Sequence, residues 1–337
     1  MSIIRIIKNI LPYGIVKLRA NKLVEIDGTE HPVLYNSDGE EVLMIYLDDY
    51  RAPHHPYNFV SGRLPKRILW DRYNHNLNLQ MYSHLRILNK KSKSVNSKQF
   101  GFLIESEQIC PEEYDAILKN TDTVNDLDAL FTHSERLLDK YSNAKFMPGG
   151  GVWYGSEKWG GEMKDDLYKS KTKLVSIVSS TKTMCPLHQF RIDIAKEMMN
   201  KGIGDVMGTV SGKFVSISDS LTDYMYSIAI ENNASNYYFT EKLLNCFASM
   251  TVPIYYGCCN LESFFNIDGV IVIKKPTVEC VMEALKGISV SDYKARIPAM
   301  IENYEKVKKY ICNEDYLTDN YMPLFSTNNE MSHELVI

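Results

Sequence analysis

The sequence lacks the signatures of several common protein classes. It contains no apolar run of about 18 residues, which excludes a transmembrane helix. It contains no P-loop, no G-x-G-x-x-G fingerprint and no G-x-S-x-G elbow. The sequence therefore gives no sign of a P-loop nucleoside triphosphatase, a classical dinucleotide-binding enzyme or an α/β-hydrolase. No small-residue cleavage site follows the apolar N-terminal stretch, so we expect no cleavable signal peptide.

Metal-binding and redox spacings are also missing. The seven cysteines are odd in number and no two form a C-x-x-C pair, so we expect reduced thiols in a cytoplasmic protein. The acidic pairs at 48–49 and 165–166 and the histidine pair at 54–55 have no ligand-spaced companions. Asp126 and Asp128 fall in a predicted helix, where their carboxylates point to different faces. We therefore expect no metal and no cofactor.

The overall composition is that of a globular protein without an excess of either charge. Hydrophobic residues make up 45% of the chain and charged residues 24%. The net charge is −4, so the overall charge of the protein does not attract nucleic acid as a partner. The 22 tyrosines suit sugar recognition, but ordinary half-buried packing explains most residues of this type equally well.

The first 20 residues combine isoleucines at helical spacing with basic side chains. Pro12 ends the apolar pattern, and the only charges before Glu25 are positive. Such a segment either lies on an anionic membrane surface or packs as a terminal helix on the protein itself. Both alternatives stay open at this stage.

A length of 337 residues suggests about two domains. The triple glycine at 149–151 and the polar run after it indicate a linker, so we place the boundary near residue 165. The predicted domains are 1–165 and 166–322, followed by a loose tail at 323–337. In the first domain the patterns at 75–88 and 126–139 predict helices, and Pro111 opens a further helix.

The second domain is organised around Tyr226 to Ile273. A short apolar strand from Ser227 to Ile230 precedes a polar turn, a helix opens at Thr240, and further strands follow at Val252–Tyr256 and Val270–Ile273. This is strand, loop, helix, strand, with polar groups where the first strand ends. Ligands of open α/β sheets bind outside the carboxyl ends of the strands, and a helix that starts there favours phosphate.

Three residues are candidates for the chemistry. Lys242 is two residues into its helix, where the helix dipole itself would favour an acid, so a phosphate partner would explain the lysine. Arg191 lies on a helix that follows a strand and polar turn, and is either a guanidinium fork for a diphosphate or a solvated side chain. Glu105 directly follows an apolar strand and is either a general base or a solvated loop carboxylate.

The sequence leaves alternatives open near Glu105 and near Lys242. Glu107, Glu112 and Glu113 lie close to Glu105 in the sequence, and the pattern does not choose among the four. Near Lys242, two residues either contact a nucleoside or serve only as a turn asparagine and a packed tyrosine: Asn232 and Tyr238.

The segment IAIENNASNYYFTEKLLNCFASMTVPIYYG closely resembles the donor-binding signature of the α-1,3/1,4-fucosyltransferases. That signature reads approximately F-x-[IL]-x-[FA]-E-N, a short spacer, Y-[VF]-T-E-K-[IL], a helix, then [VI]-P-[IV]-Y-[WY]-G. The chain matches it in order and spacing, with Asn236-Tyr237 in the spacer and Tyr256 where Trp is frequent. The first 100 residues resemble the family little.

The resemblance implies an α/β fold with two Rossmann-like domains facing a cleft, the glycosyltransferase-B architecture. It implies that the first domain binds the acceptor, that the second binds the donor, and that no divalent metal takes part. By motif position, the donor site would contain Asn232, Tyr238, Glu241 and Lys242, with Arg191 on the diphosphate. The acid that follows FLI, Glu105, would be the catalytic base.

The sequence therefore predicts an inverting, metal-independent glycosyltransferase that moves fucose from GDP-fucose to a hydroxyl of a bacterial surface glycan. The acceptor would be an oligosaccharide or lipid-linked glycan, and the enzyme would be cytoplasmic or peripheral on the inner face of the cell membrane. One alternative is the same fold with a UDP-sugar such as UDP-galactofuranose. A second is a non-catalytic nucleotide-sugar-binding protein.

Overall fold

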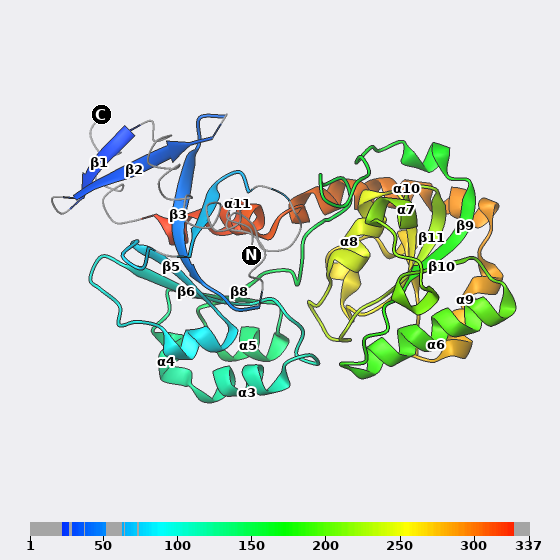
Figure 1. The fold of residues 1–337 in the computed structure, drawn as a ribbon, viewed down its shortest axis with the longest axis horizontal. Coiled ribbons are helices and arrows are strands. Elements are labelled where there is room, and N and C mark those ends of the chain that lie inside the picture. Colours follow the sequence, from blue (N-terminus) through cyan, green and yellow to red (C-terminus); the bar gives the residue numbers. More distant parts are fainter. Residues whose placement is uncertain are drawn as a thin grey trace.

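The computed structural model describes residues 22–26, 29–36, 38–51, 63, 65–72 and 74–326. Two α/β units lie side by side, each built on its own sheet (Figure 1). The predicted N-terminal helix at 1–20 lies outside the described residues, as does most of the predicted tail. Among the described helices, none is long and apolar enough to cross a bilayer.

The first unit contains an eight-stranded sheet with the order β1-β2-β3-β5-β6-β7-β8, in which β4 pairs with β3. Strands β3 to β8 are parallel, whereas β1 and β2 add an antiparallel edge. The strands are β1 (Lys22–Ile26), β2 (Thr29–Tyr35), β3 (Glu41–Asp48), β4 (Ile68–Asp71), β5 (Leu79–Ser83), β6 (Lys98–Leu103), β7 (Ala129–Thr132) and β8 (Ala144–Phe146). Every residue of β5 and β7 is buried, as expected for parallel strands covered on both faces.

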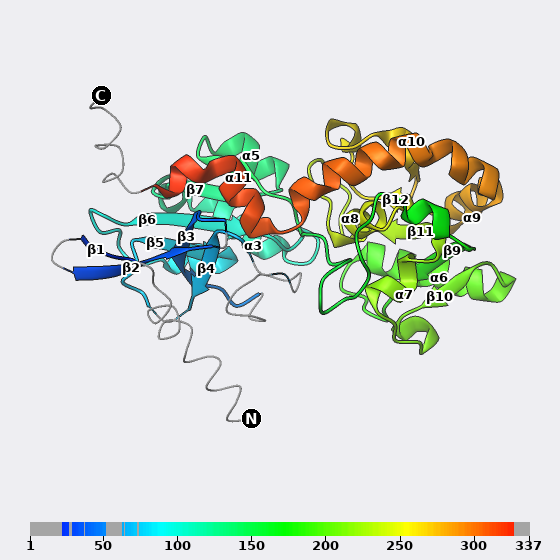
Figure 2. The same cartoon turned by 90° about the horizontal axis from the view of Figure 1, so that it is seen from above.

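Helices cover both faces of this sheet. The helices on one face are η1 (His84–Asn89), α3 (Pro111–Lys119), α4 (Thr121–Asn125) and α5 (Glu135–Lys140), which include the helix predicted at Pro111. On the other face packs α11 (Asn313–Phe325), the last helix of the described chain (Figure 2). Trp70 donates to Glu314 at 2.8 Å, and the Phe325 ring lies 4.8 Å from that of Phe100.

The return of α11 differs from the predicted division of the chain. The boundaries 166–322 and 323–337 assign this segment to the second domain and a loose tail, but Leu317 and Phe325 are buried in the core of the first sheet. The apolar face of α11 is buried there because that face of the sheet has no other described helix to cover it.

Two predicted helices in the first unit are wrong in part. The pattern at 75–88 contains strand β5 before η1, and the pattern at 126–139 contains strand β7 before α5. In each case a short, wholly buried strand runs almost directly into a helix. The apolar run of β7 lacks the alternation that marks a half-exposed strand, whereas residues 76–81 before and in β5 do alternate.

The second unit is a five-stranded parallel sheet with the order β10-β9-β11-β12-β13. The strands are β9 (Lys173–Val178), β10 (Asp205–Met207), β11 (Tyr224–Ile230), β12 (Val252–Tyr256) and β13 (Ile271–Val272). The helices are α6 (Pro186–Lys201), α7 (Ile217–Leu221), α8 (Glu241–Ala248), α9 (Val278–Gly287) and α10 (Val290–Val307). The predicted elements of the 226–273 stretch are confirmed.

This strand order has a switch point between β9 and β11. From β9 the chain moves first to one neighbour, β10, and then to the other side at β11. At such a point the connections leave a crevice outside the carboxyl ends of the strands, which is where doubly wound sheets bind ligands. The loops after β9 and β11, and the starts of α6 and α8, therefore face the place where a ligand is expected.

Candidate active site

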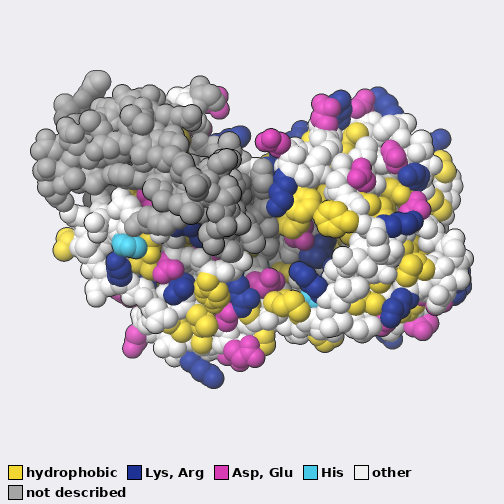
Figure 3. All heavy atoms as spheres, viewed as in Figure 1, with side chains coloured by type: hydrophobic (Ala, Val, Ile, Leu, Met, Phe, Trp, Pro, Cys, Tyr) yellow, Lys and Arg dark blue, Asp and Glu magenta, His cyan; other side chains and the backbone are white. Residues whose placement is uncertain are grey.

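A cavity of about 470 Å³ lies at this switch point, between the two units. Figure 3 shows basic and acidic side chains gathered around the hollow where the two halves of the molecule meet. Its described lining comes from both units, with Glu105 and Arg51 on the first and the loops after β9 and β11 on the second. All six residues predicted for the site line it: Glu105, Arg191, Asn232, Tyr238, Glu241 and Lys242.

The N-terminus of α8 is held at the cavity by a buried carboxylate. Thr240 caps the helix, and its backbone N–H and hydroxyl both donate to Glu231, at 2.9 and 2.7 Å. Glu231 is fully buried at the end of β11. The glycine that ends β12 makes room for it, because a Cβ on Gly257 would lie 2.4 Å from the Glu231 Cγ. These contacts explain the E-N, T-E-K and Y-Y-G parts of the motif as one packed unit.

Lys242 lies between two acids at the start of this helix. Its Nζ is 2.9 Å from Glu241 Oε1 and 3.5 Å from Glu231 Oε2. Burial lowers the pKa of Lys242, but the two carboxylates outweigh burial and hold the pKa above its usual value. Burial raises the pKa of Glu231. Lys242 therefore brings a fixed positive charge to the cavity wall.

Arg191, on α6, is a second cation whose hydrogen bonding is incomplete. Its Nη2 donates to Asn232 Oδ1 at 3.0 Å, while its Nε is buried without a partner among the described residues. Burial lowers the pKa of this guanidinium. A buried N–H without an acceptor is costly, so an anion in the cavity would satisfy it.

His188 completes the contact to Asn232 and is absent from the sequence prediction. The backbone N–H of Met184 donates to His188 Nδ1 at 3.1 Å, so the ring proton of the neutral side chain lies on Nε2. That Nε2 donates to Asn232 Oδ1 at 2.9 Å, beside Arg191. The signal for His188 is its position one turn before Arg191 on the same helix face.

Glu105 is separated from its three sequence competitors by its surroundings. Glu107 accepts hydrogen bonds from Ser134 and from Arg136, at 2.8 Å for the Arg136 Nε. Glu113 pairs with Arg51, and Glu112 is exposed and does not line the cavity. Of the carboxylates that line the described cavity, Glu105 is the one without an ion pair.

Tyr238 and the triple glycine join the two units at the cavity. Tyr238 is buried, and its ring centroid lies 4.7 Å from that of His133 across the boundary. A Cβ on Gly149 would lie 3.0 Å from the Tyr238 ring, and one on Gly150 would lie 3.3 Å from the Glu241 backbone nitrogen. The stretch predicted as a linker therefore lets the backbone approach the start of α8 closely.

The described residues contain one group that could hold a metal ion, formed by His84, Cys110 and Glu113. None of the three residues lines the cavity, but His84 accepts a hydrogen bond from Glu105, which does. The group therefore lies directly behind the cavity wall. Two of the acids considered as metal ligands in the sequence form ion pairs: Asp126 with Lys90, and Asp128 with Lys93 at 2.8 Å.

A family model matches part of the second unit. Residues 168–295 match the model of glycosyltransferase family 10 (fucosyltransferase) C-term. This stretch is similar to the fucosyltransferase C-terminal domain. The resemblance predicted from the 226–273 stretch is confirmed, because this stretch lies inside the matched residues. No curated protein matches the chain.

Solved structures are similar to the chain outside residues 168–295 as well. An α1,3-fucosyltransferase shares 16% sequence identity over 88% of this chain and 87% of that chain, with a TM-score of 0.49. An α1,3-fucosyltransferase with GDP-fucose shares 13% over 96% and 98%, also at 0.49. An α-glucosyltransferase in complex with UDP and a 13-mer DNA shares 11% over 86% and 92%, at 0.50. At these identities the likeness concerns the fold, and the predicted glycosyltransferase-B architecture is confirmed.

The contacts of His188 in the second unit predict its protonation state. Burial, and then the charge of Arg191, lower the pKa of His188 below 6.5, so the ring is neutral at pH 7 with its proton on Nε2. Nitrogen-15 NMR of the imidazole should report this tautomer, and Arg191→Ala should raise the pKa. A proton on Nδ1 at pH 7, or a pKa above 6.5 in the unsubstituted protein, would contradict the assignment.

Proposed function

We propose that this protein transfers fucose from GDP-fucose to a hydroxyl of a bacterial surface glycan, with inversion at the anomeric carbon and without a divalent metal. The observation that carries the proposal is the composition of the cavity. It combines one carboxylate without an ion pair, Glu105, with two cations and a helix N-terminus on the opposite unit. A single displacement that releases a diphosphate needs these groups, namely a base for the acceptor hydroxyl and positive charge near the leaving group.

In this mechanism Glu105 takes the proton of the acceptor hydroxyl as the acceptor oxygen forms a bond to the anomeric carbon of the donor. The bond from that carbon to the diphosphate breaks, and its electron pair leaves with the diphosphate. Arg191, Lys242 and the N–H groups at the start of α8 stabilise the charge that develops there. Attack from the side opposite the leaving group inverts the configuration at the carbon.

The electrostatics of the donor side support a reaction that needs no divalent ion. Glu231 is engaged by Thr240 and Lys242, and Glu241 is engaged by Lys242, so neither carboxylate is free to bind a cation. The positive charge that a metal would bring to a diphosphate is supplied by Arg191 and Lys242.

Glu105→Gln should lower kcat by about 100- to 10,000-fold, because the amide cannot accept the acceptor proton. Binding of the donor, measured by calorimetry with GDP, should remain nearly unchanged, since the nucleotide is held by the other unit. Glu107→Gln is the matched control, because that carboxylate is paired with Arg136. Full turnover by Glu105→Gln, or equal losses in both variants, would contradict this role.

Donor identity is tested by calorimetry and turnover with GDP-fucose beside UDP-galactofuranose. We expect binding and transfer with GDP-fucose, and a weakening of about 10- to 100-fold in donor affinity for Arg191→Ala and for Lys242→Ala, since each removes a charged hydrogen bond. Transfer from the UDP-sugar alone would contradict the assignment of fucose as the donor sugar, although the protein would still be a glycosyltransferase.

We further propose that the acceptor is lipid-linked and that residues 1–20 attach the enzyme to the inner face of the cell membrane. The support is the basic, isoleucine-rich sequence of this segment. Deletion of residues 1–20 should reduce sedimentation with anionic liposomes while transfer to a soluble acceptor continues. Equal sedimentation of the two chains would remove the membrane claim.

A further inference from the structure

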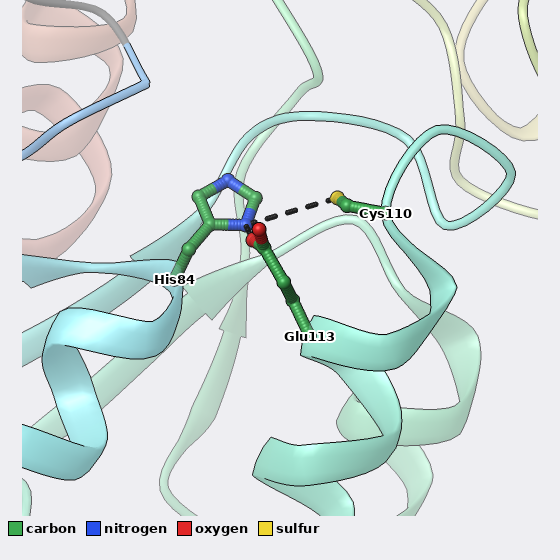
Figure 4. Close-up of side chains that lie close together, drawn as sticks. All are labelled: His84, Cys110 and Glu113. Atoms are coloured by element: carbon green, nitrogen blue, oxygen red, sulfur yellow. Dashed lines mark hydrogen bonds and ion pairs between the residues drawn. The ribbon is translucent and has the colours of Figure 1, made fainter. Parts of the chain in front are cut away.

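Three buried polar side chains, His84, Cys110 and Glu113, lie together behind the end of strand β6 (Figure 4). Their exposed fractions are 0, 2 and 8%. The Nδ1 of His84 lies 2.8 Å from Glu113 Oε2 and 4.0 Å from the Cys110 sulfur. The donor side of the proposed reaction involves none of them, so the cluster needs its own explanation.

The other nitrogen of His84 decides what the cluster does. Its Nε2 accepts the backbone N–H groups of Ile104 and Glu105, at 3.3 and 3.4 Å. The ring proton must therefore lie on Nδ1, where it faces Glu113. A metal bound at Nδ1 would require a proton on Nε2, directed at two N–H donors, so the ring orientation opposes a metal site.

The partners of His84 oppose a metal for the same reason. The second oxygen of Glu113 accepts from the guanidinium of Arg51, which already neutralises the carboxylate. Burial, and then the charge of Glu113, raise the pKa of the Cys110 thiol to about 12, so it stays protonated and is a poor ligand. The arrangement is a chain of close polar contacts in which Arg51 already balances the charge of Glu113.

We propose that Arg51, Glu113 and His84 are positioning residues that hold the backbone of Glu105 so that its carboxylate faces the acceptor hydroxyl. The chain runs from Arg51, which also lines the cavity, through Glu113 to the imidazole and ends on the Glu105 N–H. This inference rests on the proposed function, in which Glu105 is the base.

The carbonyl group of Glu105 is fixed from the opposite direction. It accepts the Tyr114 hydroxyl at 2.5 Å and the His133 Nε2 at 3.2 Å. Side chains thus hold both backbone polar groups of Glu105, two residues after the end of β6. Since a displacement of about 1 Å can cost 100-fold in rate, such a clamp has a catalytic reason as well as a structural one.

The backbone of His84 gives a second indication that its imidazole is needed. Its φ of +47° lies in the left-handed region, which a residue with a Cβ rarely adopts. Glycine would adopt this conformation without strain, but it would leave the N–H groups of Ile104 and Glu105 without their acceptor. The strained backbone places the ring between Glu113 and the end of β6.

The test compares His84→Leu in two backgrounds. In the otherwise unchanged enzyme we expect kcat to fall about 100-fold, while the affinity for GDP is kept because the nucleotide is bound by the other unit. In the Glu105→Gln background the same change should slow the residual rate no further, since there is no carboxylate left to position. His84→Gln, whose side-chain carbonyl can accept the Glu105 N–H, should recover part of the rate.

Glu113→Gln keeps the shape of its side chain and is measured in the same way, so the test does not depend on the folding of one variant. Glu112→Gln, on the exposed neighbour, should leave kcat unchanged. The inference is overturned if His84→Leu or Glu113→Gln slows the Glu105→Gln enzyme further, if neither changes kcat, or if the purified protein holds stoichiometric zinc that His84→Leu loses. High activity of Glu105→Gln itself would instead refute the proposed base.

Discussion

The buried carboxylate of Glu231 is the contact on which the donor side of the cavity depends. It accepts two hydrogen bonds from Thr240 and lies 3.5 Å from the Lys242 ammonium. A buried carboxylate is expensive unless its oxygens are engaged, so these contacts fix where α8 begins and where its N–H groups point. The same contacts hold Lys242 at the cavity wall. Gly257 is part of this constraint, because any side chain there would collide with Glu231.

The first unit must then be held in register with this fixed edge. Helix α11 returns from the second unit to the first and buries its apolar residues against the first sheet. Near the cavity, Asn236 donates to Glu135 at 2.6 Å and Tyr238 packs on His133. His133 also contacts the Glu105 carbonyl. The His133 ring therefore contacts both Tyr238 of the second unit and the backbone of Glu105, the proposed base. The two halves of the cavity are connected through this ring.

The sequence predicts the second unit well and the first unit poorly, for physical reasons. Strand β12 and helix α6 are set by local patterns, namely an apolar run that ends at Gly257 and a proline at a helix start, so their positions follow from short stretches of chain. In contrast, β5 and β7 are short strands buried on both faces that run almost directly into helices, so their patterns merge with those of the helices. The packing of Leu317 on the first sheet links residues far apart in the sequence, which no local pattern reports.

The site residues also differ in whether a local sequence pattern predicts them. Asn232 and Lys242 belong to one continuous motif, so their approach to each other follows from a single helix start. Glu105 and Arg191 come from separate segments, and only the fold brings both to one cavity. His84 carries no signal in the sequence, because its role depends on a backbone N–H twenty-one residues further along the chain.

The central claim is that one cavity binds the nucleotide diphosphate on the second unit and presents a base from the first. A crystal structure of the protein with GDP-fucose and an acceptor analogue tests it most directly. The account predicts the diphosphate on Arg191 and Lys242 at the start of α8, with the Glu105 carboxylate within hydrogen-bond distance of the acceptor hydroxyl. A diphosphate bound away from these cations, or held by a metal ion on the cavity carboxylates, would contradict it.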